Sequence, residues 1–243
     1  MTRTAAALII GNEILSGKIV DTNTTFLAQG LFELGIELRR VVVCPDEVET
    51  ISRDLSELRA AHDLVFTSGG VGPTHDDVTI EGVAQSFGKP VVRSEAVEKM
   101  IRHYYGDRAT EAHLRMANMP EGAEMIRSSE APWPTVVIDN VFVLPGVPEI
   151  FELKFTDLRK RLDQGQEFHS QAVFTLAGEG EIAGLLERIA TDFPGVMVGS
   201  YVKWRAPDYR TKVTFDGNDL QAVTKAADTL VDELEAELFV RRE

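Results

Sequence analysis

Apolar runs alternate with helix-like patterns along the first two-thirds of the chain. Ala5 to Ile10 is a continuous apolar run, which is typical of a strand buried on both faces of a parallel sheet. Asp21 to Asn23 are cap candidates for a first helix, which has Phe26, Leu27, Leu31 and Leu34 on one face and ends at Gly35. The pattern then predicts, in chain order, a strand from Ile36 to Val43, a helix with Ile51, Leu55 and Leu58 on one face, a strand from Leu64 to Phe66 and a helix from Val78 to Phe87.

Further along, the same reasoning predicts helices at Ser94 to Tyr105, Ala109 to Ala117 and Glu149 to Leu162, and a hairpin of strands Val136 to Ile138 and Val141 to Leu144. Strands that alternate with helices indicate an α/β fold with a mostly parallel sheet covered on both faces.

The character of the chain changes at the polar segment Asp163 to Glu167. The residues after it read strand, helix, strand, strand, helix, with the last helix expected from Asp219 to Leu238. We therefore predict two domains, an α/β domain at residues 1–165 and a small α+β domain with an antiparallel sheet at residues 166–243.

Four polar or glycine-bearing segments follow predicted strands: Gly11 to Glu13, Pro45 to Glu47, Ser68 to Asp77 and Pro145 to Pro148. In open α/β sheets, ligands bind outside the carboxyl ends of the strands. If the strands are parallel and adjacent, the four segments meet at one crevice, which is the expected binding site.

The segment from Thr67 to Thr79, TSGGVGPTHDDVT, has the order strand, glycine-rich turn, helix. Gly69, Gly70 and Gly72 lack Cβ atoms, so backbone N–H groups of Ser68 to Gly72 can approach an anion closely. Asp76 and Asp77 then place two carboxylates beside that anion. The pairing indicates either metal-assisted phosphate chemistry or a nucleotide ring fixed by a carboxylate, and the alternative is a purely structural turn.

Other candidates each have two interpretations. Glu13 is a ligand for a cation or a nucleobase, or else a solvated carboxylate; Asp46 and Asn23 are ligand-binding groups or helix caps. Pro145 and Gly146 precede a helix and form either a second anion site or a plain turn. Lys18 is a phosphate partner or a surface lysine.

His75, within the glycine-rich segment, is a candidate phosphate donor, metal ligand or general acid. Trp133 and Trp204 are interpreted chiefly as packing residues, with a pocket wall as the alternative.

Composition narrows the functional classes. The net charge of −14 leaves no basic stripe for nucleic acid, so an anionic ligand must be held by local groups. Cys44 is the only cysteine, which excludes an intrachain disulfide and a thiolate cluster. The sequence shows no apolar run long enough for a bilayer and no signal-peptide pattern, so we expect a cytoplasmic protein without membrane contact.

Several separated motifs, GNEILSGKIVDTN, VVVCPDEVETI, TSGGVGPTHDDVTIEGVAQSFGKP and VFVLPGVPEIFE, resemble the molybdopterin-binding fold family, which includes molybdopterin adenylyltransferases and CinA proteins. The likeness covers roughly residues 4 to 160. PDEVETI and GPTHDDVT are most similar to the N-terminal half of eukaryotic FAD synthase, and FHSQAVFTLAGEGEIAGLL, VGSYVKW and YRTKVTFD resemble the small domain that follows it.

This resemblance implies a three-layer α/β/α fold with a pocket for a phosphorylated pterin or nucleotide. It also implies that Asp46 and Asp77 support catalysis and that a divalent metal (Mg, Mn or Co) takes part, as in the CinA and FAD synthase branches. The family's usual Gly-Asp-Glu reads Gly11-Asn12-Glu13, so one carboxylate is missing. Members of the fold often form dimers or trimers, which predicts a homo-oligomer.

The leading hypothesis is hydrolysis of a pyrophosphate bond in FAD or ADP-ribose. The expected catalytic residues are Asp46, Asp76 and Asp77, with Asp46 and Asp77 as metal ligands. The expected substrate-binding residues are Glu13, Asn23, Ser68, Gly69, Gly70, Gly72, Pro73, Thr74, His75, Pro145 and Gly146. The alternatives are molybdopterin binding or adenylation and a non-catalytic ligand-binding or assembly module.

Overall fold

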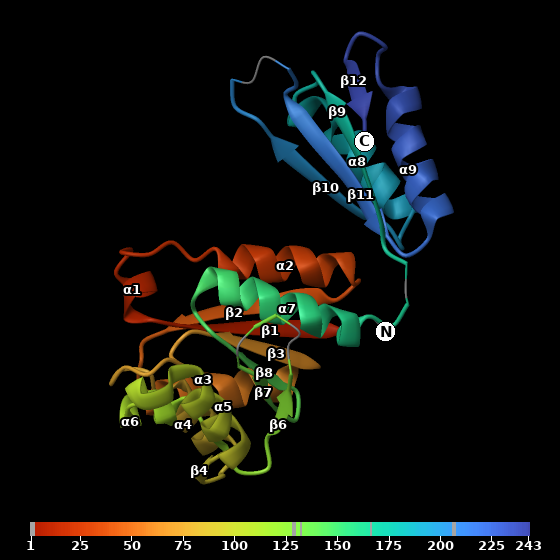
Figure 1. Cartoon of the computed structure of the whole chain (residues 1–243). Helices are drawn as coiled ribbons and strands as arrows, with labels where there is room; N and C mark the ends of the chain where they lie inside the picture. Colours follow the sequence, from red (N-terminus) through yellow and green to blue (C-terminus); the bar gives the residue numbers. More distant parts are fainter. Residues whose placement is uncertain (1–2, 128–129, 132, 166, 206–207) are drawn as a thin grey trace. The chain divides into compact units, whose positions relative to one another are not determined.

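The computed structural model describes residues 3–127, 130–131, 133–165, 167–205 and 208–243. The chain divides into two compact units, the first made of residues 1–32 and 36–163 and the second of residues 33–35 and 164–243. Each unit has its own sheet and its own core, so each is described by itself (Figure 1).

The first unit is built on one sheet whose strands lie in the order β2-β1-β3-β8-β7-β6. Its strands are β1 (Thr4–Ile10), β2 (Glu37–Cys44), β3 (Leu64–Ser68), β6 (Glu124–Ile126), β7 (Thr135–Ile138) and β8 (Val141–Leu144). The pairs β1–β2, β1–β3 and β3–β8 are parallel, while β7 and β6 are added in antiparallel fashion at one edge. The parallel strands are covered on both faces, so β1 and β3 are almost entirely buried, and their residues are apolar except Thr4, Thr67 and Ser68.

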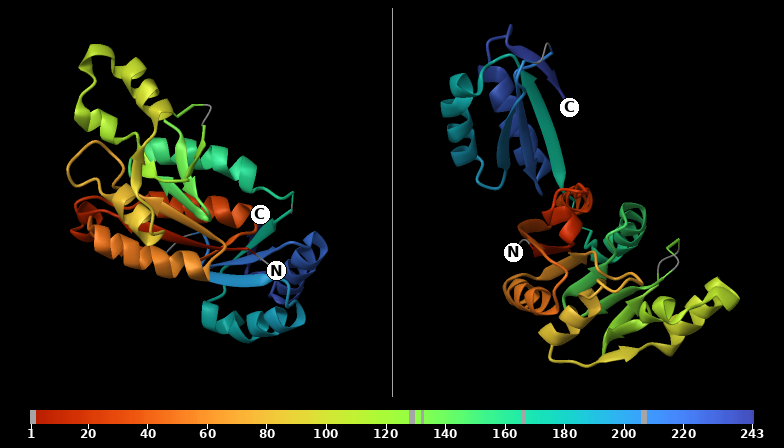
Figure 2. Two further views of the ribbon diagram at one scale, coloured as in Figure 1. Left: turned by 90° about the horizontal axis from the view of Figure 1, so that it is seen from below. Right: turned by 90° about the vertical axis from the view of Figure 1, so that its left-hand side faces the viewer.

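Helices cover both faces of this sheet. On one face α2 (Asn23–Glu33) and α7 (Pro148–Leu162) pack through Phe26 and Phe155, whose ring centroids lie 6.1 Å apart. On the other face α3 (Val48–Ala61) and α4 (Thr79–Ser86) contribute Ile51, Leu55 and Val83 to a fully buried cluster. The three layers can be followed in two further views (Figure 2) and confirm the predicted α/β/α class with a mostly parallel sheet.

An insertion between α4 and β6 was only partly predicted. It contains β4 (Val91–Arg93), α5 (Glu95–Tyr105), the 3-10 turn Gly106–Arg108, α6 (Glu111–Arg115) and β5 (Asn118–Pro120), with β4 and β5 paired in a small antiparallel sheet. The expected helix from Ala109 to Ala117 is shorter because the Thr110 side chain accepts the N–H of His113 and starts the helix there. The short helix α1 (Asn12–Leu15) was not predicted.

The second unit is an antiparallel sheet with two helices. Its elements are β9 (His169–Thr175), α8 (Glu179–Asp192), β10 (Met197–Val202), β11 (Thr211–Gly217), α9 (Leu220–Glu233) and β12 (Phe239–Arg242), and the strands lie in the order β10-β11-β9-β12. The prediction that the last helix continues to Leu238 was wrong. The backbone turns extended at Leu234, and Phe239 to Arg242 pair with β9 instead.

None of the helices in the described ranges combines the length and the apolar character needed to cross a membrane.

Candidate functional site

The carboxyl ends of the parallel strands bring together the loops that follow them. Gly11, after β1, donates its N–H to the carbonyl of Cys44 at the end of β2, with an N···O distance of 3.1 Å. Gly69, after β3, donates to the carbonyl of Leu144 at the end of β8 at 3.2 Å. The crevice expected from the sequence therefore has its four segments at one edge of the sheet.

The loop after β3 requires glycine at its first position. Gly69 has φ +107°, and a Cβ atom there would lie 2.1 Å from the carbonyl oxygen of Ile10. Gly70 has φ +64°, and its added Cβ would lie 2.3 Å from Oγ1 of Thr79. Thr79 closes the loop: its hydroxyl donates to the Gly69 carbonyl at 2.8 Å and its N–H to the Gly70 carbonyl at 3.0 Å. Thr79 is buried, and the sequence analysis did not single it out.

Main-chain N–H groups of this loop are left without partners. The Gly69 N–H is used in the sheet, but the N–H groups of Gly70, Val71 and Gly72 meet no acceptor among the residues that the structure describes. Unpaired N–H groups at a sheet edge, next to a helix N-terminus, attract an anion. The proposed anion site is thus shifted from Ser68–Gly72 to Gly70–Gly72.

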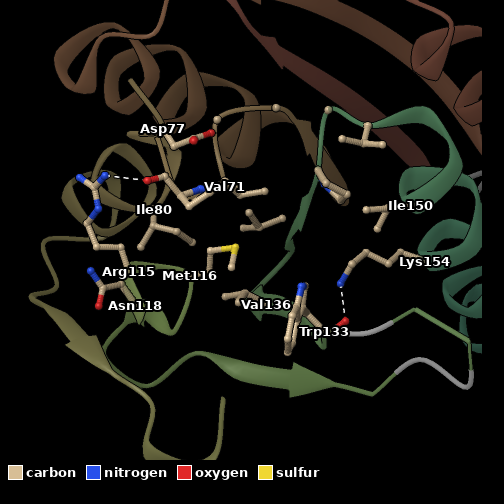
Figure 3. A pocket seen from close by; sticks show the side chains of 18 of the residues that line it. Val71, Asp77, Ile80, Arg115, Met116, Asn118, Trp133, Val136, Ile150 and Lys154 are labelled. Atoms are coloured by element: carbon tan, nitrogen blue, oxygen red, sulfur yellow. Dashed lines mark hydrogen bonds between the residues drawn. The ribbon is translucent and has the colours of Figure 1, made fainter. Parts of the chain in front are cut away.

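Asp77 reaches back across the loop. One oxygen of its carboxylate accepts the Thr74 N–H at 2.7 Å and also the Thr74 hydroxyl. The same carboxylate lies against Gly72, where an added Cβ would be 2.7 Å from Oδ2. Asp77 faces the cavity beside the glycine loop, as the close-up view shows (Figure 3).

The other predicted acids lie less centrally. Asp46 accepts the Asn12 N–H at 2.8 Å, and its pKa is raised because the side chain is partly buried, with the nearby carboxylates of Glu13, Asp76 and Asp77 adding to the effect. The exposed Asp76 has a lowered pKa because the polar Thr74 side chain nearby, together with the main chain, stabilises its charged form. Neither Asp46 nor Asp76 lines the cavity.

His75 and Thr74 also lie outside the cavity lining. The side chain of His75 is 95% exposed, with its Nδ1 3.9 Å from a carboxylate oxygen of Asp76. Thr74 acts on the loop itself, through its bonds to Asp77. Pro73, Pro145 and Gly146, by contrast, do line the cavity.

The acidic residues fit a divalent cation only in part. Within the described ranges, no three His, Cys, Asp or Glu side chains come together closely enough to hold a metal ion by themselves. The charge of Asp77 is nevertheless one of the smaller causes that raise the pKa of Asp46. One or two carboxylates completed by water and substrate phosphates are the ligand set that Mg²⁺ accepts, so these two residues suit a cation that binds with its substrate.

Asn23 and Ser68 tie the loops together. The buried Asn23 donates from Nδ2 to Oγ of Ser68 and to the Gly146 carbonyl, both at 2.9 Å. The helix cap is Asp21, whose carboxylate accepts the Thr24 N–H at 3.0 Å. Asn23 is therefore not the helix cap, and it fixes the start of α2 against two strand ends. Its ligand-binding role stays a prediction, and it lines a second, smaller pocket beside these strand ends.

A cavity of about 580 Å³ extends from the glycine loop to the β7–β8 side of the sheet. Glu13, Gly69, Gly70, Gly72, Asp77 and Gly146 line its first end. Five apolar side chains contribute to the rest of the lining, namely Ile80, Met116, Val136, Val143 and Ile150, and the polar Glu81 and Asn118 also line the cavity. The view in Figure 3 places Asp77 and Arg115 at one end and Trp133 with Lys154 at the other.

The cavity carries two cationic side chains that the sequence analysis missed. Arg115, from α6, donates to the carbonyls of Pro73 at 2.7 Å and Thr74 at 3.1 Å, which fixes the glycine loop from outside. Lys154, from α7, is 5% exposed and donates to the carbonyls of Trp133 at 2.6 Å and Pro134 at 2.9 Å. Lys18, the lysine considered from the sequence, is exposed and does not line the cavity.

Trp133 forms part of an aromatic group at the Lys154 end. Its ring is stacked with Tyr105 at a centroid distance of 6.3 Å and meets Tyr104 edge-on at 5.3 Å. It packs against a buried cluster and also lines the cavity, so both roles considered for Trp133, packing and pocket wall, apply. Trp204, in the second unit, is 82% exposed and does not pack as predicted.

Burial makes the charge of Lys154 depend on pH. It lowers the pKa of Lys154 from 10.5 to about 8. Below pH 8 both the folded and the unfolded chain carry the proton, so the burial penalty is fully present. Between the two pKa values only the unfolded chain carries it, so the free energy of unfolding rises with pH.

We therefore expect wild-type protein to gain roughly 3 kcal/mol of stability relative to Lys154→Met between pH 7.5 and pH 10.5. Urea unfolding of both proteins across this pH range measures the difference in their free energies of unfolding. The contributions of all other titrating groups are the same in both proteins and cancel in this difference. If the difference in the free energy of unfolding does not change with pH, Lys154 does not have the pKa lowered by burial that this account requires.

Two models of known protein families match successive segments of the chain. A family model described as "Probable molybdopterin binding domain" matches residues 6–164, and one described as "FAD synthase, middle domain" matches residues 167–243. The first match covers more than half of the chain.

Individual relatives agree with these matches. A protein of Archaeoglobus fulgidus is 35% identical over 217 residues, covering 89% of this chain and 92% of the relative. The "Probable FAD synthase" of Caenorhabditis elegans is 33% identical over 241 residues; this covers 88% of this chain but 46% of that protein, so the chain spans less than half of it. The crystal structure of the protein CinA from Thermoplasma acidophilum superposes with a TM-score of 0.62 at 33% identity, covering 66% of this chain and 98% of CinA.

Proposed function

The chain belongs to the probable molybdopterin-binding domain family, and from that premise we propose that its cavity binds a nucleotide or pterin phosphate and that it hydrolyses the pyrophosphate bond of FAD or ADP-ribose. One observation carries the proposal: a single cavity joins the glycine loop and Asp77 to an apolar and aromatic chamber. A phosphorylated ring compound has the same two parts, an anion and a flat apolar body.

The phosphate end of the cavity can hold an anion despite the acidic chain. The net charge of −14 repels an anion at long range, so the attraction must be local. Free N–H groups at Gly70, Val71 and Gly72 supply it, and the guanidinium of Arg115 lies on the carbonyl side of the same loop. These dipoles are already oriented, so they need no rearrangement when negative charge develops on the phosphate oxygens during the reaction.

Hydrolysis forms one bond and breaks one. A water oxygen bonds to a phosphorus atom, the bridging P–O bond breaks, and AMP leaves with the bonding electrons. We assign orientation of the water, and receipt of its proton, to Asp77, because this carboxylate lines the cavity next to the loop that binds phosphate. Glu13 lines the same end, and Glu81 also lines the cavity, so two further carboxylates are within reach of a ligand.

A divalent cation is part of the proposal. Mg²⁺, Mn²⁺ or Co²⁺ bound by Asp46 and Asp77 together with substrate phosphates would neutralise charge on the phosphates and lower the pKa of bound water. Burial is the main reason that the pKa of Asp46 is raised, and repulsion from Glu13, Asp76 and Asp77 adds to it; a cation would relieve that repulsion, which supports this assignment.

The test is direct. Purified protein incubated with FAD or ADP-ribose and each of the three metal ions should release AMP, detected by chromatography, and chelation by EDTA should stop the release. Absence of turnover with every combination of substrate and metal would contradict the hydrolase assignment.

The family description supports a second candidate, binding or adenylation of molybdopterin. This reaction joins the AMP group of ATP to the terminal phosphate of the pterin and releases pyrophosphate. Pterin fluorescence that copurifies with the protein, or transfer of labelled AMP from ATP, would favour it over hydrolysis.

A non-catalytic ligand-binding module is favoured instead if ligands bind with the same affinity to wild type and Asp77→Ala and neither protein turns them over.

A further inference from the structure

The end of the cavity remote from the glycine loop has a chemistry of its own. Lys154 is held there in a fixed position, since its ammonium group donates to the main-chain carbonyls of Trp133 and Pro134. The third contact, to Oγ1 of Thr135, is 3.5 Å long and therefore weak. An ammonium group has three donors, so one N–H of Lys154 remains available to a ligand.

No carboxylate balances this buried charge in the described part of the chain. Lys154 donates its hydrogen bonds to two carbonyl oxygens and one hydroxyl oxygen, and none of these acceptors carries a charge. A buried ammonium without an acidic partner is unfavourable unless an electron-rich ligand atom completes its surroundings. Lys154 lines the cavity, so the ligand can supply that atom.

The walls at this end suit a flat ring. Val136 lies beside Trp133 and Ile150 beside Lys154 (Figure 3), and Met116 and Val143 add to the apolar lining of the cavity. Stacking on Tyr105 and edge contact with Tyr104 fix the indole, so the wall is rigid. Rigid aromatic and apolar walls with one polar donor are typical of sites that hold a heteroaromatic ring in one orientation.

We propose that the Trp133–Lys154 end of the cavity binds the ring of the ligand and that Lys154 selects rings that carry a carbonyl oxygen at the edge facing it. This inference rests on the proposed function, because the phosphate at the glycine loop places the ring at this end. An ammonium group donates and never accepts. A ring with a carbonyl oxygen at that edge therefore gains a charged hydrogen bond, whereas a ring with an amino group there faces a second donor. Of the two proposed substrates this selection favours FAD, whose flavin ring carries carbonyl oxygens, over ADP-ribose, whose only heteroaromatic ring is adenine.

A matched pair of ligands isolates this contact. ADP and inosine diphosphate have the same ribose and phosphates. ADP carries an amino group at C6 of its ring, whereas inosine diphosphate carries a carbonyl oxygen at C6 and a proton on N1. At pH 7 Lys154 is protonated, because its pKa lies at about 8. Isothermal titration in EDTA measures both affinities without hydrolysis.

For wild-type protein we expect inosine diphosphate to bind about tenfold more tightly than ADP. In Lys154→Met the ratio should fall to about one, chiefly through weaker binding of inosine diphosphate. The matched control is Lys160→Met on the same helix, whose exposed lysine pairs with Asp157, and it should keep the wild-type ratio. Lys154→Gln also removes the charge and serves if the methionine variant does not fold.

The outcomes separate the two proposals. Equal affinities in the wild type, or a tenfold ratio that survives in both Lys154 variants, would overturn the selection of carbonyl-bearing rings and leave the phosphate site intact. Equal weakening of both ligands in Lys154→Met would also overturn it, because Lys154 would then contact phosphate. Absence of binding by both ligands in the wild type would overturn the proposed function as well.

Discussion

Replacing Asp77 by asparagine is expected to lower the rate of pyrophosphate cleavage about 1000-fold, which corresponds to roughly 4 kcal/mol of transition-state stabilisation. The amide keeps an oxygen that can accept the Thr74 N–H, a bond of 2.7 Å in the wild type, so the loop keeps its shape. What is lost is the negative charge that orients water and helps to hold the cation. The affinity for ADP-ribose in EDTA should stay within about threefold, because binding to the N–H groups does not use this charge.

Two other aspartates, one adjacent in sequence and one in the second unit, provide the controls for Asp77→Asn. Asp76→Asn should have a much smaller effect than Asp77→Asn, because the Asp76 side chain is exposed and outside the cavity. Asp232→Asn, on an exposed position of α9 in the second unit, should leave AMP release unchanged. Equal losses for Asp76→Asn and Asp77→Asn would contradict the distinction that the structure draws between them.

Replacing Gly69 by alanine is expected to destabilise the protein by about 4 kcal/mol. The added Cβ would be 2.1 Å from the Ile10 carbonyl oxygen, which belongs to the central strand, and the residue would keep φ +107°. Main-chain atoms of a buried strand cannot move aside cheaply. Urea unfolding midpoints of the two proteins measure the loss.

Gly88→Ala separates the steric clash from the backbone conformation. Gly88 also has a positive φ, +62°, but an added Cβ there has no neighbour within 4 Å. Its replacement should therefore cost only about 1 kcal/mol, the penalty of the left-handed conformation. If Gly69→Ala is no less stable than Gly88→Ala, the close packing of the glycine loop on β1 is wrong.

The strands of the parallel sheet could be predicted because their chemistry is local. Ala5 to Ile10 and Leu64 to Phe66 are apolar throughout, and burial on both faces requires that. The short strands β4, β5 and β12 could not be predicted, since they carry few apolar residues and depend on partners that are distant in sequence. The chain after Leu234 keeps a helical spacing of leucines, yet pairing with β9 determines its structure.

The candidate site was predictable where it depends on glycine and less so where it depends on tertiary contacts. Gly69 and Gly70 have the positive φ that a glycine-rich turn predicts. Arg115 gave no signal, because the fold of the insertion brings it to the loop. Lys154 did give one: with Phe151, Phe155 and Leu158 it lies on the buried stripe of α7, where a lysine needs an explanation.

The central claim is that N–H groups of the glycine loop bind the phosphate of a nucleotide or pterin ligand. Amide chemical shifts of isotope-labelled protein, titrated with ADP-ribose in EDTA, test it most directly. The account predicts that the amides of Gly70, Val71 and Gly72 shift most, while the Gly69 amide, already bonded to Leu144 at 3.2 Å, changes little. Binding of ADP-ribose with these three amides unmoved, or with its largest shifts outside the cavity, would contradict the account.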